Sequence, residues 1–321
     1  MQPLALRHAA RRPAPWGFTR VEFVGAMVLA AVLIALLLPA IQWRREQSRR
    51  TFCQNNLYQL SWAAIRHEEQ HGFLPGWRND GPAAGGVSSW PIVLLPYLER
   101  NDIFKAIAAG QPAPVFVTSF ACPSSPPNGF MGPVLAYAGN CGSGSNLRRA
   151  DGVMLDTTIS AGMNPGRLQL EDIAGKDGTA QTLILAEKCG AGTAAAALVQ
   201  AEWNDAIPVT SGTSIPGFSN GTRVHAVFGI VGSTPPLPWI INSPAAAAPG
   251  FFSQPSSNHG GGASVAICDG STKFLSQMIS PGVYAQLLSW DDTECRMNPD
   301  LYATHDAWVS GKPAKNTEAG E

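Results

Sequence analysis

Charged side chains are scarce in this chain of 321 residues, where Asp, Glu, Lys and Arg make up only 14% of the sequence. An ordinary soluble domain carries about 25%. The 22 basic and 23 acidic residues nearly cancel, so the formal net charge is −1. A nucleic-acid-binding protein uses a basic excess to neutralise phosphates, and this sequence has none. We therefore expect no nucleic-acid partner.

No two of the six cysteines form a Cys-x-x-Cys pair. This absence excludes zinc-ribbon, ferredoxin and thioredoxin motifs, which are built on such pairs. An even number of cysteines is compatible with disulfides in an exported protein. Cys122 and Cys141 are flanked by turn residues and are the pair we favour, with Cys189 and Cys268 as the alternative. Cys53 is predicted to be a buried free thiol, and six free thiols are expected if the protein meets no oxidant.

Glycine and proline are abundant, with 33 and 26 copies. Together they exceed their average share of roughly 12% by about half. This composition argues against an all-helical bundle and favours short strands joined by turns. Hydrophobic residues make up 45% of the chain, which excludes wholesale disorder.

The N-terminal region combines a basic leader with an apolar run. Residues 1–17 contain three arginines and no acid, and the nineteen residues from Phe23 to Ile41 carry no charge. A helix needs about 20 residues to span the core of a bilayer. A secretory signal peptide and a plain transmembrane anchor both fit this pattern. Neither explains the polar residues from Thr19 to Glu22 that directly precede the apolar run.

One long helix is predicted from Phe18 to about Gly72, interrupted only by Gly25 and Pro39. Its first half is apolar on all sides, which is typical of a helix in lipid or in a protein bundle. Its second half has apolar residues at helical spacing, which indicates one buried face. These residues are Cys53, Leu57, Leu60 and Ala64.

The rest of the chain consists of short apolar runs separated by Gly, Pro, Asn and Ser. Most runs have four to eight residues and are rich in β-branched side chains, so we predict strands. The runs are Ile92–Leu95, Val115–Val117, Thr182–Leu185, Val224–Val231 and Ser264–Ile267. A short helix is predicted around Tyr97–Phe104. The expected fold class is α+β, with a long N-terminal transmembrane helix packed on an antiparallel sheet with loop-rich β elaborations.

A hairpin is predicted where Asp269 and Gly270 separate two apolar runs, because Asp-Gly is typical of a type I′ turn. His259 precedes this hairpin and is followed by three glycines, which would let the backbone approach another segment closely. His259 and Asp269 could act as metal ligands or as an acid–base pair. A lone histidine without spaced partners instead favours a hydrogen bond within the fold.

Two short motifs match parts of a hydrolase site. Gly217–Gly221 fits the Gly-x-Ser-x-Gly nucleophile elbow, and His259–Gly262 fits an oxyanion-hole loop. The elbow needs a strand before the serine and a helix after it, whereas Pro216 precedes it and residues 222–228 are strand-like. The oxyanion loop also follows the serine instead of preceding it. We therefore predict that the protein is not an enzyme.

Acidic residues in loops raise calcium binding as an alternative, because Ca²⁺ prefers oxygen ligands. None has the spacing of an EF-hand, so no cofactor is predicted. These residues are Asp151, Asp156, Asp291, Asp292 and Asp300.

Four tryptophans lie near Gly- and Pro-rich loops, where aromatic rings stack on sugars or cover the edge of a core. They are Trp77, Trp90, Trp203 and Trp239.

The segment Gly17-Phe18-Thr19-Arg20-Val21-Glu22 resembles the cleavage and methylation site of type IV prepilins and type II secretion pseudopilins. In these proteins a prepilin peptidase cuts after the glycine and the new N-terminal Phe is methylated. A Glu at the fifth mature position, occupied here by Glu22, pairs with the N-terminal amine of a neighbouring subunit. Pro39 also matches a proline of the pattern, whereas Arg20 stands where Leu is usual.

Nearly the whole chain resembles the large bacterial family called domain of unknown function 1559. Its members pair a prepilin-type N-terminus with a C-terminal His-x9-Asp-Gly motif, and the resemblance implies no enzymatic activity. It extends from Gly17 to about Trp290. The matching segments are Asn55–Leu60, His71–Pro75, Ser89–Glu99, Phe120–Ser124, Tyr137–Asn140, Asp177–Glu187 and His259 with Asp269 and Gly270.

These resemblances imply a leader over residues 1–17, an assembly helix over 18–41, its second half over 42–72, an exported head over 73–300 and a polar tail over 301–321. The implied function is a pseudopilin-like subunit with a single pass through the bacterial inner membrane and a periplasmic or extracellular head. Its partners would be prepilin peptidase and other pilin-like subunits. The alternative is an anchored, exported binding module for a glycan or protein that does not polymerise.

Overall fold

The computed structural model describes residues 17, 19–82, 86–111, 115–124, 134–143, 152–155, 157–158, 166–188, 201–202, 227–230, 241–242 and 255–291. The chain divides into two compact units, residues 1–47 and residues 48–321. The predicted leader up to Trp16, the new N-terminal Phe18 and the polar tail lie outside the described residues.

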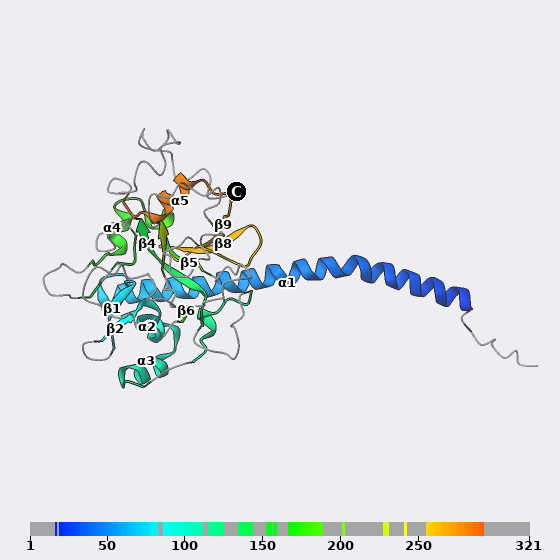
Figure 1. The fold of residues 1–321 in the computed structure, drawn as a ribbon, viewed down its shortest axis with the longest axis horizontal. Coiled ribbons are helices and arrows are strands. Elements are labelled where there is room, and N and C mark those ends of the chain that lie inside the picture. The colour runs from blue at the N-terminus through cyan, green and yellow to red at the C-terminus, as the bar shows by residue number, and fades with distance from the viewer. Residues whose placement is uncertain are drawn as a thin grey trace, which may run out of the picture. The chain divides into compact units, whose positions relative to one another are not determined.

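A single helix, α1, runs from Arg20 to His71 and confirms the predicted long helix (Figure 1). Gly72 follows with φ of +77°, a conformation that ends helices and that glycine adopts without steric cost. In the first unit, the large apolar side chains of α1 from Val21 to Ile41 are exposed. This part of α1 is long and apolar enough for a single membrane span or a signal sequence.

The head, from Ser48 onward, contains a five-stranded sheet in the order β7-β4-β5-β8-β9. Four of its strands pair antiparallel as predicted, whereas the edge strand β7 runs parallel to β4. The strands are β4 (Tyr137–Ser143), β5 (Leu183–Glu187), β7 (Val227–Ile230), β8 (Gly262–Ile267) and β9 (Thr272–Ser276). Two small sheets pair β1 (Arg78–Asp80) with β2 (Val87–Ser89) and β3 (Val134–Leu135) with β6 (Ala201–Glu202).

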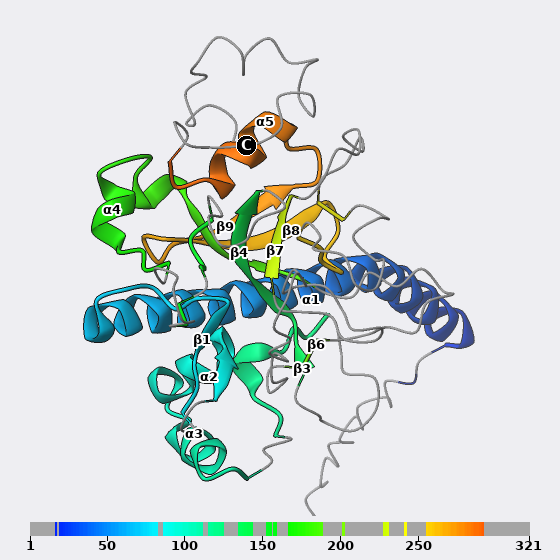
Figure 2. The same ribbon diagram turned by 60° about the vertical axis from the view of Figure 1, so that its left-hand side comes forward.

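Short helices complete the head. The second half of α1 lies between the five-stranded sheet and the region of α2 and α3, and α5 lies beyond the sheet (Figure 2). The helices are α2 (Trp90–Leu94), α3 (Asn101–Ala108), α4 (Leu170–Ala174) and α5 (Pro281–Leu288). Single 3₁₀ turns cover Leu95–Leu98, Thr118–Phe120 and Thr179–Gln181.

The central strands of the sheet are buried on both faces. Along β8, Val265 and Ile267 pack with Tyr284 and Leu288 of α5, whereas Ala266 belongs to the core around α1. This alternation follows the two-residue period of a strand. The core around α1 contains the predicted stripe of Cys53, Leu57, Leu60 and Ala64. The architecture is therefore α+β and pilin-like, with a long helix against an antiparallel sheet.

Two of the predicted strands are wrong. Ile92–Leu95 falls within α2 and the 3₁₀ turn after it, because Pro91 occupies the first helical turn, where its fixed φ suits a helix. Val115–Val117 pairs with no strand among the described residues and leads into the turn Thr118–Phe120. The predicted helix around Tyr97–Phe104 is interrupted at Glu99, which has a φ of 60°, and continues as α3.

The predicted hairpin between β8 and β9 is confirmed, but its turn type differs. Gly270 has a φ of +86°, whereas Asp269 is not among the residues with positive φ. The N–H of Gly270 donates to the carbonyl of Ile267 at 3.0 Å, and the N–H of Ser271 donates to the Asp269 side chain at 2.8 Å. One left-handed glycine at the end of the turn is typical of a three-residue hairpin loop with a β-bulge. A type I′ turn would need two residues with positive φ.

His67 anchors the end of α1 in the head. Its ring is buried, its Nδ1 lies 3.2 Å from the carbonyl oxygen of Phe73, and it stacks on His71 with ring centroids 4.2 Å apart. Tyr97 packs against its edge. Burial, and then the neighbouring His71, lower the pKa of His67 to about 4. The folded protein therefore keeps this imidazole neutral at mildly acidic pH.

Replacing His67 with glutamine is expected to make the free energy of unfolding depend less on pH between about pH 6.5 and pH 4. The unfolded chain takes up this proton near pH 6.5 and the folded chain only near pH 4, so stability is lost as the pH falls between these values. The loss is up to about 3 kcal/mol. Urea unfolding near pH 7 and near pH 4.5 measures it. His71→Gln should keep most of the loss of stability between pH 7 and pH 4.5, since burial is the larger cause of the lowered pKa of His67. If His67→Gln loses as much stability as the wild type between these pH values, His67 is not the group responsible.

Candidate functional site

The first turn of α1 carries the residues of the predicted processing segment. Gly17 and Thr19 are exposed and precede the helix. The Glu22 carboxylate accepts hydrogen bonds from the backbone N–H of Thr19 at 2.8 Å and from its hydroxyl at 2.9 Å, and the N–H of Glu22 donates to the Thr19 hydroxyl at 3.3 Å. This reciprocal pattern is a capping box. The Thr-x-x-Glu spacing signals it, and the sequence interpretation did not use that signal.

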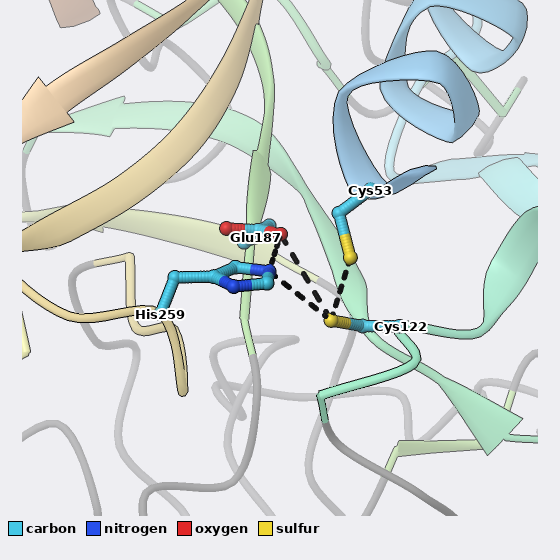
Figure 3. Close-up of side chains that lie close together, drawn as sticks. All are labelled: Cys53, Cys122, Glu187 and His259. Atoms are coloured by element: carbon cyan, nitrogen blue, oxygen red, sulfur yellow. Dashed lines mark hydrogen bonds and ion pairs between the residues drawn. The ribbon is translucent and has the colours of Figure 1, made fainter. Parts of the chain in front are cut away.

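Four potential metal-ligating side chains converge inside the head. Cys53 lies on α1, Cys122 follows the 3₁₀ turn Thr118–Phe120, Glu187 ends β5 and His259 lies in the loop before β8 (Figure 3). Each has 3% or less of its surface exposed. We call these residues the Cys-Cys-Glu-His cluster.

The ligand atoms of the cluster all lie within 4.8 Å of one another. The sulfur atoms of Cys53 and Cys122 are 2.7 Å apart. The Cys122 sulfur lies 3.7 Å from Nε2 of His259 and 4.0 Å from Oε1 of Glu187. Nε2 of His259 and Oε1 of Glu187 are 3.3 Å apart. Each side chain therefore points into one small volume, as Figure 3 shows.

Backbone contacts hold the members of the cluster in place. The second carboxylate oxygen of Glu187 accepts the N–H of Ser264 on β8 at 2.8 Å. The N–H of His259 donates to the Ser257 hydroxyl at 3.1 Å. Asn56, one helical turn after Cys53, donates to the carbonyl of Ala121 at 2.9 Å and to the Tyr137 hydroxyl at 3.1 Å.

The electrostatics of the cluster are those of a buried and acidic site. The hydrogen bond to Cys122, followed by burial, raises the pKa of the Cys53 thiol. Burial, followed by the nearby thiols and Glu187, also raises the pKa of the Tyr137 hydroxyl. A carboxylate and two thiols in an apolar core disfavour a further negative charge, so a positive partner is needed before either sulfur ionises.

The predicted disulfide between Cys122 and Cys141 is wrong. Neither cysteine is in a disulfide. The sulfur of Cys122 instead lies beside that of Cys53. The thiol of Cys141 on β4 donates to the carbonyl of Met154 at 3.6 Å. Cys53 is a buried free thiol as predicted. Cys268 is also free, and Cys189 lies outside the described residues, so the alternative pair is not described.

The structure separates the two ends of the His-x9-Asp-Gly motif. His259 is buried in the cluster, whereas Asp269 is exposed at the tip of the β8–β9 hairpin, where it caps the turn. Gly270 packs under the second half of α1: its carbonyl faces the hydroxyl of Ser61 at 3.4 Å, and an added Cβ would lie 2.9 Å from Nε1 of Trp62. The partner of His259 is Glu187, not Asp269.

Two of the tryptophans considered for sugar binding belong to the core, because Trp77 and Trp90 are buried. Trp203 and Trp239 lie outside the described residues, as do Gly217–Gly221 of the hydrolase motif. Exposed aromatic rings instead flank a groove of about 570 Å³ beside α1. Tyr58 and Trp62 line it from the helix, and Tyr97 lines it from the 3₁₀ turn Leu95–Leu98.

A long helix with an exposed apolar N-terminal part and an α+β head defines a pilin-like class of protein. Within this class, the chain belongs to the family described as "Protein of unknown function (DUF1559)", whose model matches residues 42–282, more than half of the chain. No curated protein matches the chain. No solved structure matches it either.

The sequence pattern does not predict the Cys-Cys-Glu-His cluster as a group. It favours a disulfide for Cys122, a buried free thiol for Cys53 and a hydrogen bond within the fold for His259. Glu187 is only the last residue of a family-like segment. One signal in the sequence is that Cys122, Glu187 and His259 each belong to a different segment that resembles the family. Cys53 lies two positions before a further such segment, Asn55–Leu60. All four lie within the matched residues 42–282.

Proposed function

We propose that the protein is a pseudopilin-like structural subunit. Prepilin peptidase would cleave it after Gly17, and the segment Phe23–Ile41 would hold it in the bacterial inner membrane. From there it would assemble with other pilin-like subunits into a type II secretion pseudopilus or a related fibre. The observation that carries this proposal is the run of exposed apolar side chains on α1, which begins directly after the Gly17–Glu22 segment.

The exposed apolar part of α1 favours lipid or neighbouring helices as its surroundings. Each large apolar side chain gains about 1.5–3 kcal/mol when it leaves water. Thirteen such side chains between Val21 and Ile41 are exposed in the isolated chain. Both a bilayer and a bundle of subunit helices would cover them. An acid at the head of such a segment is costly and is a functional candidate, which applies to Glu22.

A non-enzymatic role accords with the burial of the head's polar groups. The Cys-Cys-Glu-His cluster joins a thiol, an imidazole and a carboxylate, as nucleophilic sites do. Its members have 3% or less of their surface exposed, so a substrate would not reach them without opening the core. We therefore propose that the head has a structural role.

Mass spectrometry of the N-terminal peptide tests this function. In protein from bacterial membranes that contain prepilin peptidase, we expect a peptide that begins at Phe18 and carries one added methyl group. Gly17→Val should retain the leader, because a branched side chain at the cleaved bond replaces a glycine. Gly25→Val is the matched control, since a side chain at Gly25 meets nothing within 4 Å. An intact Met1 or a terminus beyond Ile41 contradicts the proposal.

The groove beside α1 favours a second candidate function, an anchored binding module. The exposed rings of Tyr58 and Trp62 give it stacking surfaces for a glycan or an extended peptide. Under this function an intact Met1 terminus is expected, and the protein remains monomeric in the membrane. The same N-terminal measurement therefore separates the two candidates.

A further inference from the structure

We propose that the Cys-Cys-Glu-His cluster binds one zinc ion that fastens the second half of α1 to the sheet of the head. This inference is independent of fibre assembly, because an anchored module that never polymerises would need the same attachment. It begins from the convergence of four ligating atoms from four separate segments. Positions 53 and 122 are 69 apart, and positions 122 and 259 are 137 apart.

The donor set suits zinc. Cysteine sulfur, histidine nitrogen and carboxylate oxygen are its usual protein ligands, and structural sites use four of them in a tetrahedron. Calcium and magnesium take oxygen ligands almost exclusively, so two sulfurs exclude them here. The four ligands are also buried, with no ligand position turned toward solvent, as in closed structural sites.

The distances fit a tetrahedral ion with one adjustment. Metal–ligand bonds of about 2.0–2.3 Å place neighbouring ligand atoms roughly 3.3–3.8 Å apart. The His259–Glu187 distance of 3.3 Å and the Cys122–His259 distance of 3.7 Å lie in this range, and the Cys122–Glu187 distance of 4.0 Å is close to it. The two sulfurs, at 2.7 Å, must move apart by about 1 Å. Rotation of the Cys53 side chain on α1 supplies a movement of this size.

The charges also favour a cation. As metal ligands the two cysteines would be thiolates, and together with the Glu187 carboxylate they would carry three negative charges, whose burial costs several kcal/mol for each. A divalent ion at their centre offsets this cost. Ligating groups in known metal sites are oriented by further hydrogen bonds, and the Glu187 carboxylate has such a contact. Here Ser264 holds the Glu187 carboxylate and Ser257 holds the backbone at His259.

A disulfide between Cys53 and Cys122 is the competing arrangement. It would use only two of the four convergent groups, and it would leave the Glu187–His259 pair buried beside a neutral sulfur bridge. Zinc gives a role to all four. The two arrangements exclude each other, because the sulfurs of a disulfide have no thiolate charge to give to a metal.

Metal analysis of the detergent-solubilised full chain tests the proposal. Protein from membranes is reduced, stripped with EDTA, loaded with ZnCl₂, desalted and measured by plasma mass spectrometry. We expect one zinc per chain, falling at least tenfold in Cys122→Ser and in His259→Gln. Cys141→Ser is the matched control: it removes a buried free thiol of the same head outside the cluster and should retain one zinc.

Cobalt replacement keeps the test decisive if those variants fail to fold. Co²⁺ added to the stripped wild-type chain should give the near-ultraviolet thiolate-to-cobalt band and the intense visible bands of a tetrahedral site. Zinc should then abolish them. Failure of the wild-type chain to bind either ion overturns the proposal. So does zinc binding that survives both cluster substitutions, or a Cys53–Cys122 crosslinked peptide in protein purified without reductant. N-terminal processing is read separately and does not affect these outcomes.

Discussion

Replacing Gly262 with alanine is expected to lower the free energy of unfolding of the head by about 3 kcal/mol or more. Gly262 is the first residue of β8, is buried, and pairs with Ser276 of β9. A Cβ at this position would overlap the carbonyl oxygen of Leu275, and it would lie 2.8 Å from the ring of Phe274. The obstructing group is backbone, so β8 and β9 must separate. Overpacking of this kind costs typically 1–3 kcal/mol, and loss of strand pairing adds to it.

Gly260 provides the matched control two residues earlier in the same glycine run. An added Cβ there meets nothing within 4 Å, and its φ is not positive, so Gly260→Ala should change stability by no more than about 0.5 kcal/mol. In thermal unfolding followed by circular dichroism, the melting temperature of Gly262→Ala should be at least about 6 °C below that of Gly260→Ala. Equal melting temperatures for the two variants would show that β8 and β9 are not packed as described.

The long helix and the central strands could be predicted because each is encoded locally. The stripe from Cys53 to Ala64 repeats at helical spacing, and the core around α1 contains all four of its members. Within the predicted runs, Leu183–Leu185 and Val265–Ile267 are continuously apolar, because β5 and β8 are covered by α1 on one face and by α5 on the other. The close approach expected of the glycines after His259 is realised at Gly262.

The short elements were harder because a run of four apolar residues fits a helix as well as a strand. Ile92–Leu95 became helical because Pro91 starts a helix and because Trp90 and Leu94, four positions apart, are both buried. The turn at Asp269 was assigned to the wrong type for a similar reason. Asp-Gly permits several turns, and the pairing of Ala266 with Thr272 leaves too many residues for a two-residue loop.

The Cys-Cys-Glu-His cluster could not be predicted from spacing, because its members are brought together only by the tertiary fold. Metal motifs that can be read from sequence place two ligands within a few residues on one turn or helix. Here each ligand comes from a different element, and the sheet order β5-β8 is what sets Glu187 beside the loop of His259. The separate segments were visible in the sequence; their convergence needed the pairing of β5 with β8 and the packing of α1.

Replacing Glu22 with glutamine is expected to reduce fibre incorporation at least tenfold while leaving α1 intact. The proposed assembly uses the carboxylate charge, which would pair with the N-terminal amine of a neighbouring subunit once the leader is removed. In an apolar environment such a pair is strong, and an unpaired amine is costly. Glutamine removes the charge but keeps the oxygen that accepts the Thr19 N–H, because capping boxes accept Gln as well as Glu.

Thr19→Ala is the matched variant that separates assembly from helix capping. It removes the hydroxyl that caps the N–H of Glu22, at a cost of about 0.5–2 kcal/mol to the helix end, but it leaves the carboxylate in place. Crosslinking of subunits in membranes, compared with the monomer, measures incorporation. We expect multimers for wild type and Thr19→Ala and only monomer for Glu22→Gln. If Glu22→Gln assembles normally and Thr19→Ala does not, Glu22 serves the helix end alone. Its place in the first turn is then no evidence for a fibre.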